Sequence, residues 1–443
     1  MSSPEIEAPE DFFTWADSHM NLEKGTIPFD KRNYRLDRMR FLLGLFGDPD
    51  RSYGIVHVAG TKGKGSTSTF LASVLAASGR KVGLFTKPHV FTPLERITVD
   101  GAMPDPGPFV ETGRRIREVV ESTPAGRLPG GFPPTAFELY TVIGLLFFRD
   151  AGCDTAVVET GIGGRLDATN VVFPEASVIT VLDLEHTEVL GDTLEKIASE
   201  KAGIIKDGVP VYVARQEPEA REVFRTRALL TGSPVHFLDG ETETLAVEPT
   251  LRGSDVHLRF HGDPMALDFR LRLLGAFQAE NAALACLCLR DRFPGIPREA
   301  YLDGLAKADL PGRMELFAGT PPVILDGGHT PLAVRRLLES WRTFFPGEAV
   351  LLFGSVAGKN PTEMARILAP GFSRIVVSTP GTYKQSRPRE VYDIFRALNP
   401  DTELEEDPAR ALARARELAD GVRPILVTGS FYMVAEIRKL LAR

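Results

Sequence analysis

A glycine-rich loop is the feature of the sequence with the clearest chemistry. It lies between a β-branched apolar run, Gly54 to Ala59, and a helical pattern from Thr69 to Ala77, and it consists of Gly60, Thr61, Lys62, Gly63, Lys64, Gly65 and Ser66. Glycines let backbone N–H groups face phosphates, a helix N-terminus adds positive potential, and Lys64 can neutralise β- and γ-phosphates. Ser66 either caps the helix or meets a magnesium ion. Alone, the loop predicts only that a nucleoside triphosphate binds.

Three further residues have chemistry that depends on their surroundings. Glu159 ends an apolar strand pattern, where ligands of parallel sheets gather, and its carboxylate suits magnesium; a helix or turn cap is the alternative. His186 follows the run Val178 to Leu182 and could be an ordinary loop histidine. Lys201, taken by itself, is typical of a surface ion pair.

Alternating strand and helix patterns must position these residues. Short apolar runs occur at residues 54–59, 81–85, 155–159, 176–181 and 209–213, with helical stretches between them. This βαβ pattern predicts a mainly parallel sheet covered by helices. Residues 239–271 alternate differently and predict antiparallel strands at one edge of that sheet, followed by a helix from Ala279 to Arg292.

The length of 443 residues exceeds what one core usually supports, so we expect two domains. Pro311 and Gly312 interrupt the pattern within residues 309–313, and strand candidates then restart at 322–325, 349–353, 374–378 and 424–428. We predict an α/β protein with a nucleotide-binding domain over residues 1–308, a linker at 309–313 and a smaller Rossmann-like α/β domain over 314–443.

Composition excludes several classes of partner. With 52 basic and 59 acidic side chains the net charge is -7, which gives no general attraction to nucleic acid or anionic membranes. The cysteines lack metal-ligand or disulfide spacing, no signal peptide is visible, and the longest apolar run, Val142 to Phe148, is far too short to span a bilayer. We expect a cytoplasmic monomer with reduced, buried thiols and no nucleic-acid or membrane partner.

Several motifs together resemble one family. Gly-Thr-Lys-Gly-Lys-Gly-Ser is similar to the phosphate loop of the Mur ligase superfamily, in particular its folylpolyglutamate synthase and dihydrofolate synthase branch. The segment from Glu159 to Asn170, Glu-Thr-Gly-Ile-Gly-Gly-Arg-Leu-Asp-Ala-Thr-Asn, resembles that branch nearly residue for residue. His186-Thr187 with Leu190-Gly191, and then Glu200 to Ile204, follow in the family's order and spacing.

This resemblance implies a role for each matching residue. It assigns Glu159, His186, Lys201 and Ser66 to one or two magnesium ions, with Lys201 carbamylated, and it makes Lys64, His186 and Lys201 the catalytic residues. With the loop, Asn281, Arg313 and Asp326 are assigned to ATP. The pterin side is assigned Thr135, Phe137, Asp167 and Ala168, although Phe137 could equally be a core residue. His329 and Ser430 are expected to face the incoming amino acid.

The activity implied is an ATP-dependent amide ligase that adds L-glutamate to a folate or pteroate carboxylate through an acyl phosphate. The alternatives are another Mur-type ligase with a different acid substrate, and a phosphate-loop ATPase without ligase activity. The chain departs from the family at Lys87, where a magnesium-binding serine is usual, and at Arg35, where a small pair lines the pteroate site. Either Lys87 supplies charge to a phosphate or Thr86 replaces the serine.

Overall fold

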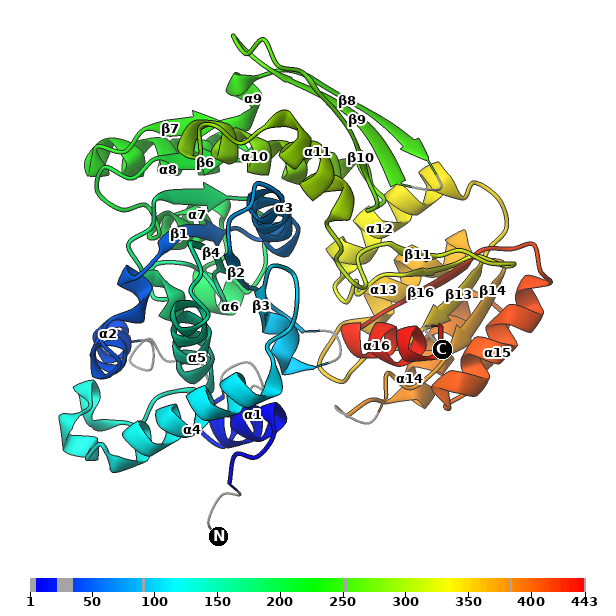
Figure 1. Cartoon of the computed structure of the whole chain (residues 1–443). Helices are drawn as coiled ribbons and strands as arrows, with labels where there is room; N and C mark the ends of the chain where they lie inside the picture. The colour runs from blue at the N-terminus through cyan, green and yellow to red at the C-terminus, as the bar shows by residue number, and fades with distance from the viewer. Residues whose placement is uncertain (1–4, 22–34, 90–91, 251–252, 382–384, 442–443) are drawn as a thin grey trace. The chain divides into compact units, whose positions relative to one another are not determined.

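Two α/β units make up the part of the chain that the computed structural model describes, which comprises residues 5–21, 35–89, 92–250, 253–381 and 385–441 (Figure 1). The first unit contains Met1–Ala246, Val256–Phe269 and Gln278–Ala308, and the second contains Val247–Asp255, Arg270–Phe277 and Asp309–Arg443. Within the described residues, none of the helices combines the length and apolar character that crossing a membrane requires.

The first unit is built on a mainly parallel sheet with the strand order β3-β2-β4-β1-β5-β6-β7. Its strands are β1 (Gly54–Ala59), β2 (Val82–Phe85), β3 (Ile97–Val99), β4 (Thr155–Glu159), β5 (Ala176–Ile179), β6 (Val211–Val213) and β7 (Val235–Phe237). Only β3 among the paired strands described runs antiparallel to its neighbour. The predicted strands of this sheet are therefore confirmed, with slightly shifted ends.

The helices connect these strands in the βαβ manner that the sequence predicts. They are α1 (Pro9–Asp17), α2 (Leu36–Leu45), α3 (Lys64–Ala77), α4 (Pro106–Ser122), α5 (Ala136–Asp150), α6 (Thr187–Leu190), α7 (Leu194–Ala202), α8 (Pro218–Thr231), α9 (Leu238–Glu241), α10 (Ala276–Arg292) and α11 (Arg298–Lys307). Short 3-10 helices among the described residues are η2 (Pro49–Arg51), η3 (Pro93–Arg96), η4 (Ala125–Arg127), η5 (Pro129–Gly131), η6 (Ala168–Val171) and η7 (Ala369–Gly371).

Strand register brings the site residues to one edge of the sheet. Val58 of β1 lies opposite Glu159 of β4, and Ala59 lies opposite Ile179 of β5. Because these strands are parallel, the loops that follow them all leave from their carboxyl ends, where ligands of α/β sheets bind.

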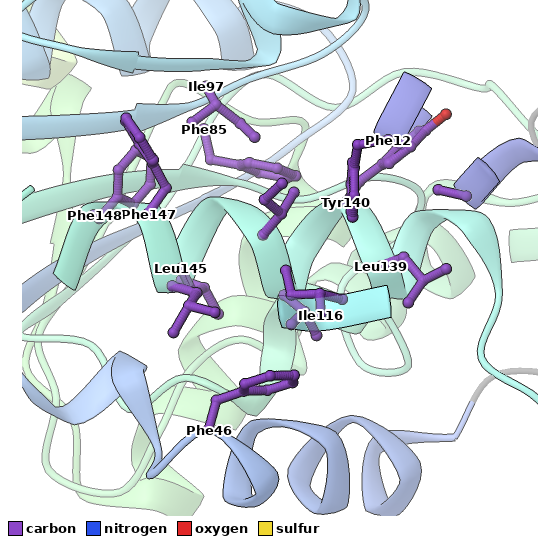
Figure 2. Packing of buried hydrophobic residues seen from close by; sticks show 14 of the residues in the cluster. Phe12, Phe46, Phe85, Ile97, Ile116, Leu139, Tyr140, Leu145, Phe147 and Phe148 are labelled. Atoms are coloured by element: carbon purple, nitrogen blue, oxygen red, sulfur yellow. The ribbon is translucent and has the colours of Figure 1, made fainter. Parts of the chain in front are cut away.

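Helix α5 fills the core on one side of this sheet. Figure 2 shows its side chains Leu139, Tyr140, Leu145, Phe147 and Phe148 with Phe85 of β2 and Ile97 of β3. A second cluster, which includes Ile179, Ile197 and Phe224, packs α7 and α8 against β5 and β6. The cysteines Cys153, Cys286 and Cys288 are buried and free, as the sequence predicts.

The strands predicted at the edge of the main sheet form a sheet of their own. It has the order β10-β9-β8 and consists of β8 (Thr242–Thr250), β9 (Gly253–Phe260) and β10 (Leu267–Leu271). The connections are too short for a parallel crossover, so the strands are antiparallel as expected. Their placement at the edge of the main sheet is wrong, because sequence alternation predicts strands but not their pairing partner.

The second unit has another mainly parallel sheet, in the order β11-β12-β16-β13-β14-β15. Its strands are β11 (Glu315–Phe317), β12 (Val323–Leu325), β13 (Val350–Phe353), β14 (Arg374–Val377), β15 (Thr402–Leu404) and β16 (Ile425–Thr428). Its helices are α12 (Pro331–Phe344), α13 (Pro361–Leu368), α14 (Pro388–Leu398), α15 (Pro408–Ala419) and α16 (Phe431–Leu441). A core around Trp341 and Phe353 is confined to this unit.

Candidate active site

The glycine-rich loop connects β1 directly to α3. This helix begins earlier in the chain than the helical pattern from Thr69 predicts. Gly63 is the N-cap in the left-handed conformation, at φ 88°, and α3 begins at Lys64. Ser66 therefore lies inside the first turn and is buried. The alternative that Ser66 caps the helix is wrong, because the cap position belongs to a glycine that can adopt positive φ.

Two glycines allow the loop to touch its neighbours. A Cβ on Gly60, at φ 148°, would lie 1.8 Å from Thr180 Oγ1, and one on Gly63 would lie 2.3 Å from Asn281 Oδ1. Asn281 of α10 is thus placed beside the loop, and its Nδ2 donates to Gln278 Oε1 at 3.1 Å. Because α10 begins at Ala276, Gln278 lies within the first turn of that helix.

The two lysines of the loop have different partners. Lys64 Nζ donates to the carbonyl oxygens of Gly60, at 3.1 Å, and Thr61, at 3.4 Å, and burial lowers its pKa. Lys62 Nζ instead donates to Glu185 Oε1 at 2.9 Å. Burial alone would raise the pKa of Glu185, but the ion pair with Lys62 outweighs it and holds that pKa at about 2. Sequence reasoning missed Glu185, although it directly precedes His186.

The polar groups around the loop fit a polyphosphate. Among the described residues, the buried hydroxyls of Thr67, Ser68, Thr160 and Thr180 have no hydrogen-bond partner. Thr67 and Ser68 lie in the first turns of α3, whereas Thr160 and Thr180 follow β4 and β5. Buried hydroxyls are costly to leave unpaired, so this edge of the sheet is built to receive polar ligand atoms.

Glu159 ends β4 and is only 2% exposed. Its Oε2 accepts the backbone N–H of Lys87 at 3.1 Å. No group of three or more His, Cys, Asp or Glu side chains in the described part of the chain could hold a metal by itself. A single carboxylate such as that of Glu159 fits magnesium, which typically keeps waters and substrate phosphates as ligands beside one or two carboxylates.

His186 and Lys201 lie on separate elements after β5. His186 is the N-cap of α6, in the left-handed conformation at φ 54°; its side chain is 46% exposed, and partial burial lowers its pKa. Lys201 lies in the last turn of α7 and is only 3% exposed. Burial, reinforced by the charge of Lys64, moves the pKa of Lys201 well below its usual value. The surface ion-pair alternative for Lys201 is therefore wrong.

Two of the residues predicted to face a pterin, Phe137 and Asp167, lie against Gly161. A Cβ on Gly161 would lie 2.8 Å from Phe137 Cζ and 2.8 Å from Asp167 Oδ2. The ring of Phe137 is half-buried, and Lys87 Nζ lies 5.6 Å from its centroid. Phe137 also packs against the core cluster around α5, with its ring centroid 6.2 Å from that of Phe85, so its role at the pterin stays a prediction.

Thr135, Asp167 and Ala168 all organise backbone at this place. Thr135 caps α5 in a reciprocal capping box with Glu138. Asp167 caps η6, which begins at the buried Ala168, and its Oδ2 accepts the N–H groups of Gly161 and Ile162 at 2.8 and 3.0 Å. The contacts of Asp167 fix the backbone of the loop that follows β4.

In the second unit, the predicted site residues gather around Phe431, a residue that sequence reasoning left without a role. The guanidinium carbon of Arg313 lies 4.5 Å from the Phe431 ring centroid, and the ring of His329 lies 5.8 Å from it. Ser430 Oγ accepts the N–H of Met433 at 3.0 Å, at the start of α16. These contacts put three of the four predicted residues of this unit at one place.

Asp326, the fourth residue, follows β12, and its carboxylate accepts backbone hydrogen bonds from two separate segments. Its Oδ1 accepts the N–H of Gly328 at 2.8 Å, and its Oδ2 accepts the N–H of Met314 at 3.0 Å. Burial raises the pKa of Asp326, and the nearby charge of Arg313 opposes that shift. Asp326 is therefore held in a fixed orientation by Gly328 and by Met314, the residue that follows Arg313 in sequence.

Comparisons with known proteins decide the family. The Mur ligase middle domain matches residues 135–289, and the Mur ligase, glutamate ligase domain matches residues 312–431. The chain is 33% identical over 443 residues to the dihydrofolate synthase/folylpolyglutamate synthase of Bacillus subtilis, covering 98% of this chain and 99% of that protein. The chain belongs to the folylpolyglutamate synthase/dihydrofolate synthase family of Mur ligases.

Other relatives of the folylpolyglutamate synthase family agree. A probable bifunctional folylpolyglutamate synthase/dihydropteroate synthase of Haloferax volcanii is 36% identical over 427 residues; the match covers 94% of this chain but only 50% of that protein, so the chain spans about half its length. The structure of Mycobacterium tuberculosis folylpolyglutamate synthase complexed with ADP has a TM-score of 0.87 at 28% identity, covering 98% and 99% of the two chains. The family and the two-part α/β fold predicted from sequence are confirmed, and the chain is an acid–amino acid ligase.

Two departures from the folylpolyglutamate synthase pattern have defined surroundings. The backbone N–H of Lys87 donates to Glu159 Oε2, and Lys87 Nζ lies 5.6 Å from the centroid of the Phe137 ring. Arg35 Nε donates to Asp37 Oδ1 at 3.0 Å, and a Cβ on Gly130 would lie 2.9 Å from its NH1. Asn33 and Tyr34, beside Arg35 in sequence, lie outside the described residues.

Proposed function

We propose that this chain is an ATP-dependent ligase that adds L-glutamate to the carboxylate of a folate or pteroate through an acyl phosphate. The observation that carries the proposal is that one edge of the first sheet holds both the phosphate loop with Lys64 and the loop that begins at Glu159 and passes Phe137. A phosphate site beside an aromatic surface suits transfer of a phosphoryl group to an acid that carries a flat ring. The relatives named above support the same substrates.

In this proposal, residues 1–308 bind ATP and the pterin acid. Bound ATP supplies the γ-phosphoryl group, and one or two magnesium ions screen its charge. Residues Gly60 to Ser66 hold the phosphates, with Lys64 placed to stabilise the charge that develops during transfer. Asn281 contacts the nucleotide, Glu159, His186 and Ser66 hold the metal, and Phe137 stacks on the pterin with Thr135, Asp167 and Ala168 around it.

Lys201 is proposed to carry a carbamate. Because burial and neighbouring cations favour its neutral form, its Nζ lone pair is available to attack the carbon of carbon dioxide. An N–C bond forms, a C=O π bond opens to give the new carboxylate, and the amine loses one proton. The product is an anion that removes the repulsion a protonated Lys201 would exert on a nearby metal.

Residues 314–443 are proposed to receive the amino acid, with 309–313 as the linker. Arg313 and Asp326 would contact ATP, while His329 and Ser430 face glutamate. The α-amino group of glutamate attacks the acyl carbon, a C–N bond forms, phosphate leaves with the electron pair of the broken C–O bond, and the amine loses its proton. We also propose that the enzyme is a cytoplasmic monomer.

A coupled ADP-release assay tests this function. Dihydropteroate, dihydrofolate and tetrahydrofolate are each supplied with ATP and magnesium, with and without glutamate, and products are identified by mass spectrometry. We expect glutamate-dependent ADP release and a product that gains one glutamyl residue. ADP release at an equal rate without acid or glutamate would identify an ATPase. If none of the three acids supports glutamate-dependent ADP release, the enzyme would be a Mur-type ligase with a different acid substrate.

A further inference from the structure

His57 is a fully buried titratable residue that the proposed mechanism does not use. It lies in β1, three residues before the phosphate loop, between Val158 of β4 and Ser177 of β5 in the sheet register. Its Nε2 lies 2.9 Å from Thr169 Oγ1. Its Nδ1 has no hydrogen-bond partner among the described residues. Buried polar groups are normally hydrogen-bonded, so the single side-chain hydrogen bond of His57 calls for an explanation.

Counting protons fixes the direction of this hydrogen bond. Thr169 Oγ1 has one proton and donates it to Asp167 Oδ1 at 2.5 Å. The remaining hydroxyl lone pairs can only accept, so His57 Nε2 must carry a proton and donate it to Thr169. The neutral imidazole then leaves Nδ1 as an unprotonated acceptor, which has no hydrogen-bond partner among the described residues. Burial, aided by the charge of Lys206, lowers the pKa of His57 to about 3 and keeps the ring neutral.

The chain of hydrogen bonds ends on the backbone of the loop after β4. Asp167 Oδ1 also accepts the backbone N–H of Thr169 at 3.0 Å, while Oδ2 accepts those of Gly161 and Ile162. Asp167 and Thr169 are 4% and 0% exposed. In such dry surroundings each charge-assisted bond is strong, and the orientation of the carboxylate depends on all its donors.

The orientation of Asp167 in turn sets the position of Gly161. Gly161 lies between Asp167 Oδ2 and the Phe137 ring, both within 2.8 Å of where its Cβ would be. Glu159 is two residues earlier in the same segment. A hydrogen-bond chain from the strand before the phosphate loop thus reaches the segment between the proposed metal ligand and the proposed pterin surface.

We propose that His57 is a positioning residue, which donates from Nε2 to Thr169 and thereby holds Asp167 and the segment Glu159 to Thr169 in the geometry that binds the pterin acid. This inference rests on the proposed function for the identity of the acid. The relay itself is a property of the first unit and does not depend on catalysis.

Nitrogen-15 NMR of histidine-labelled protein tests the tautomer directly. We expect His57, assigned by its loss in His57→Gln, to carry its proton on Nε2 and to show no titration between pH 5 and 8. A proton on Nδ1, or titration within that range, would overturn the inference. This measurement needs no substrate, so it decides the relay even if the chain transfers no glutamate and the proposed function fails.

Variant kinetics test the effect on the loop. Thr169→Val and His57→Leu each remove a donor from the chain and are expected to raise KM for the pterin acid about tenfold, with the Kd for ADP unchanged. Thr169→Ser keeps the hydroxyl, and His57→Gln keeps an amide donor near the place of Nε2, so both should restore KM to within about twofold of wild type. The His57→Leu/Thr169→Val double variant should be no worse than Thr169→Val alone, because both interrupt one chain.

His236→Gln is the matched control, since His236 stacks on Tyr212 and bonds Glu241 far along the sheet order from β4. It should leave KM unchanged. Unchanged KM in Thr169→Val and His57→Leu would overturn the inference. So would an equal loss of ADP binding, because that would mean a general disturbance of the unit.

Discussion

At the residue scale, burial decides what each lysine of the site can do. Lys62 is partly exposed, and its Nζ pairs with Glu185 Oε1 at 2.9 Å. Lys64 and Lys201 are withdrawn from water, which lowers the pKa of each. For Lys64 this loss of hydration strengthens its attraction to any phosphate that enters, and for Lys201 it favours a nucleophilic amine.

Replacing Lys64 should stop turnover. Lys64→Ala removes the cation nearest the proposed phosphates, and we expect kcat/KM to fall at least about 1000-fold in the ADP-release assay. Lys307→Ala serves as the control, because Lys307 is 71% exposed on α11. Retained activity in Lys64→Ala would remove the loop from the mechanism.

His57 should make stability depend on pH in a defined window. Unfolded chains protonate this histidine near its ordinary pKa of 6.5, whereas the folded protein holds the pKa at about 3. The unfolded state therefore binds more protons between these values, and between pH 6.5 and about 3 His57 lowers the unfolding free energy by about 1.4 kcal/mol for each unit that the pH falls.

Urea unfolding of wild type and His57→Gln at pH 7 and pH 5 measures this contribution. We expect the wild type to lose more stability between the two pH values than the variant does. Equal losses would show that the imidazole does not stay neutral in the fold.

At the element scale, the N-terminus of α5 is fixed by a buried charge in addition to its Thr135 cap. Glu138 closes the capping box of α5 and also accepts two hydrogen bonds from Arg38 Nε and one from Arg38 NH2, at 2.9 to 3.1 Å. Arg38 is 2% exposed and belongs to α2. Burial raises the pKa of Glu138 in spite of this partner. The pair joins α2 to the turn that presents Phe137.

Breaking this buried pair should be costly, whereas breaking an exposed pair nearby should not. Arg38→Met leaves Glu138 buried without its cation, and we expect a loss of about 3 kcal/mol in unfolding free energy measured with urea. Arg35→Met removes the pair with Asp37, whose side chains are 38% and 54% exposed, and should cost at most about 0.5 kcal/mol. Equal effects would mean that the buried pair is not what fixes α2.

At the scale of the whole molecule, each unit has its own sheet and its own core. The residues proposed for the pterin all belong to the first unit, and those proposed for the amino acid all belong to the second. Division of two substrates between two units is an expected arrangement for a ligase, since each acid can be recognised by independent surfaces.

Two substitutions test this division. Phe137→Ala should raise KM for the pterin acid about tenfold through lost stacking, with little change in KM for glutamate. His329→Ala should do the reverse. Steady-state kinetics with each substrate varied in turn measures both, and a shift of both KM values in either variant would argue against separate sites.

The sequence by itself determined the inner strands of both sheets, the two α/β parts and the phosphate loop, whereas the edge strands β3, β7, β11 and β15 were not predicted. Each of the predicted features is encoded locally, by short β-branched and apolar runs or by a run such as Gly60 to Ser66. The family resemblance followed from the same local motifs.

Only the tertiary structure decided which strands pair and which distant residues are in contact. It separated β8, β9 and β10 from the main sheet, moved the start of α3 to Lys64 and buried Lys201. It also joined His57 to Thr169 and gathered Arg313 and His329 around Phe431. These outcomes depend on contacts between residues far apart in the chain, and the periodicity of a single segment carries no information about which distant segment will cover it.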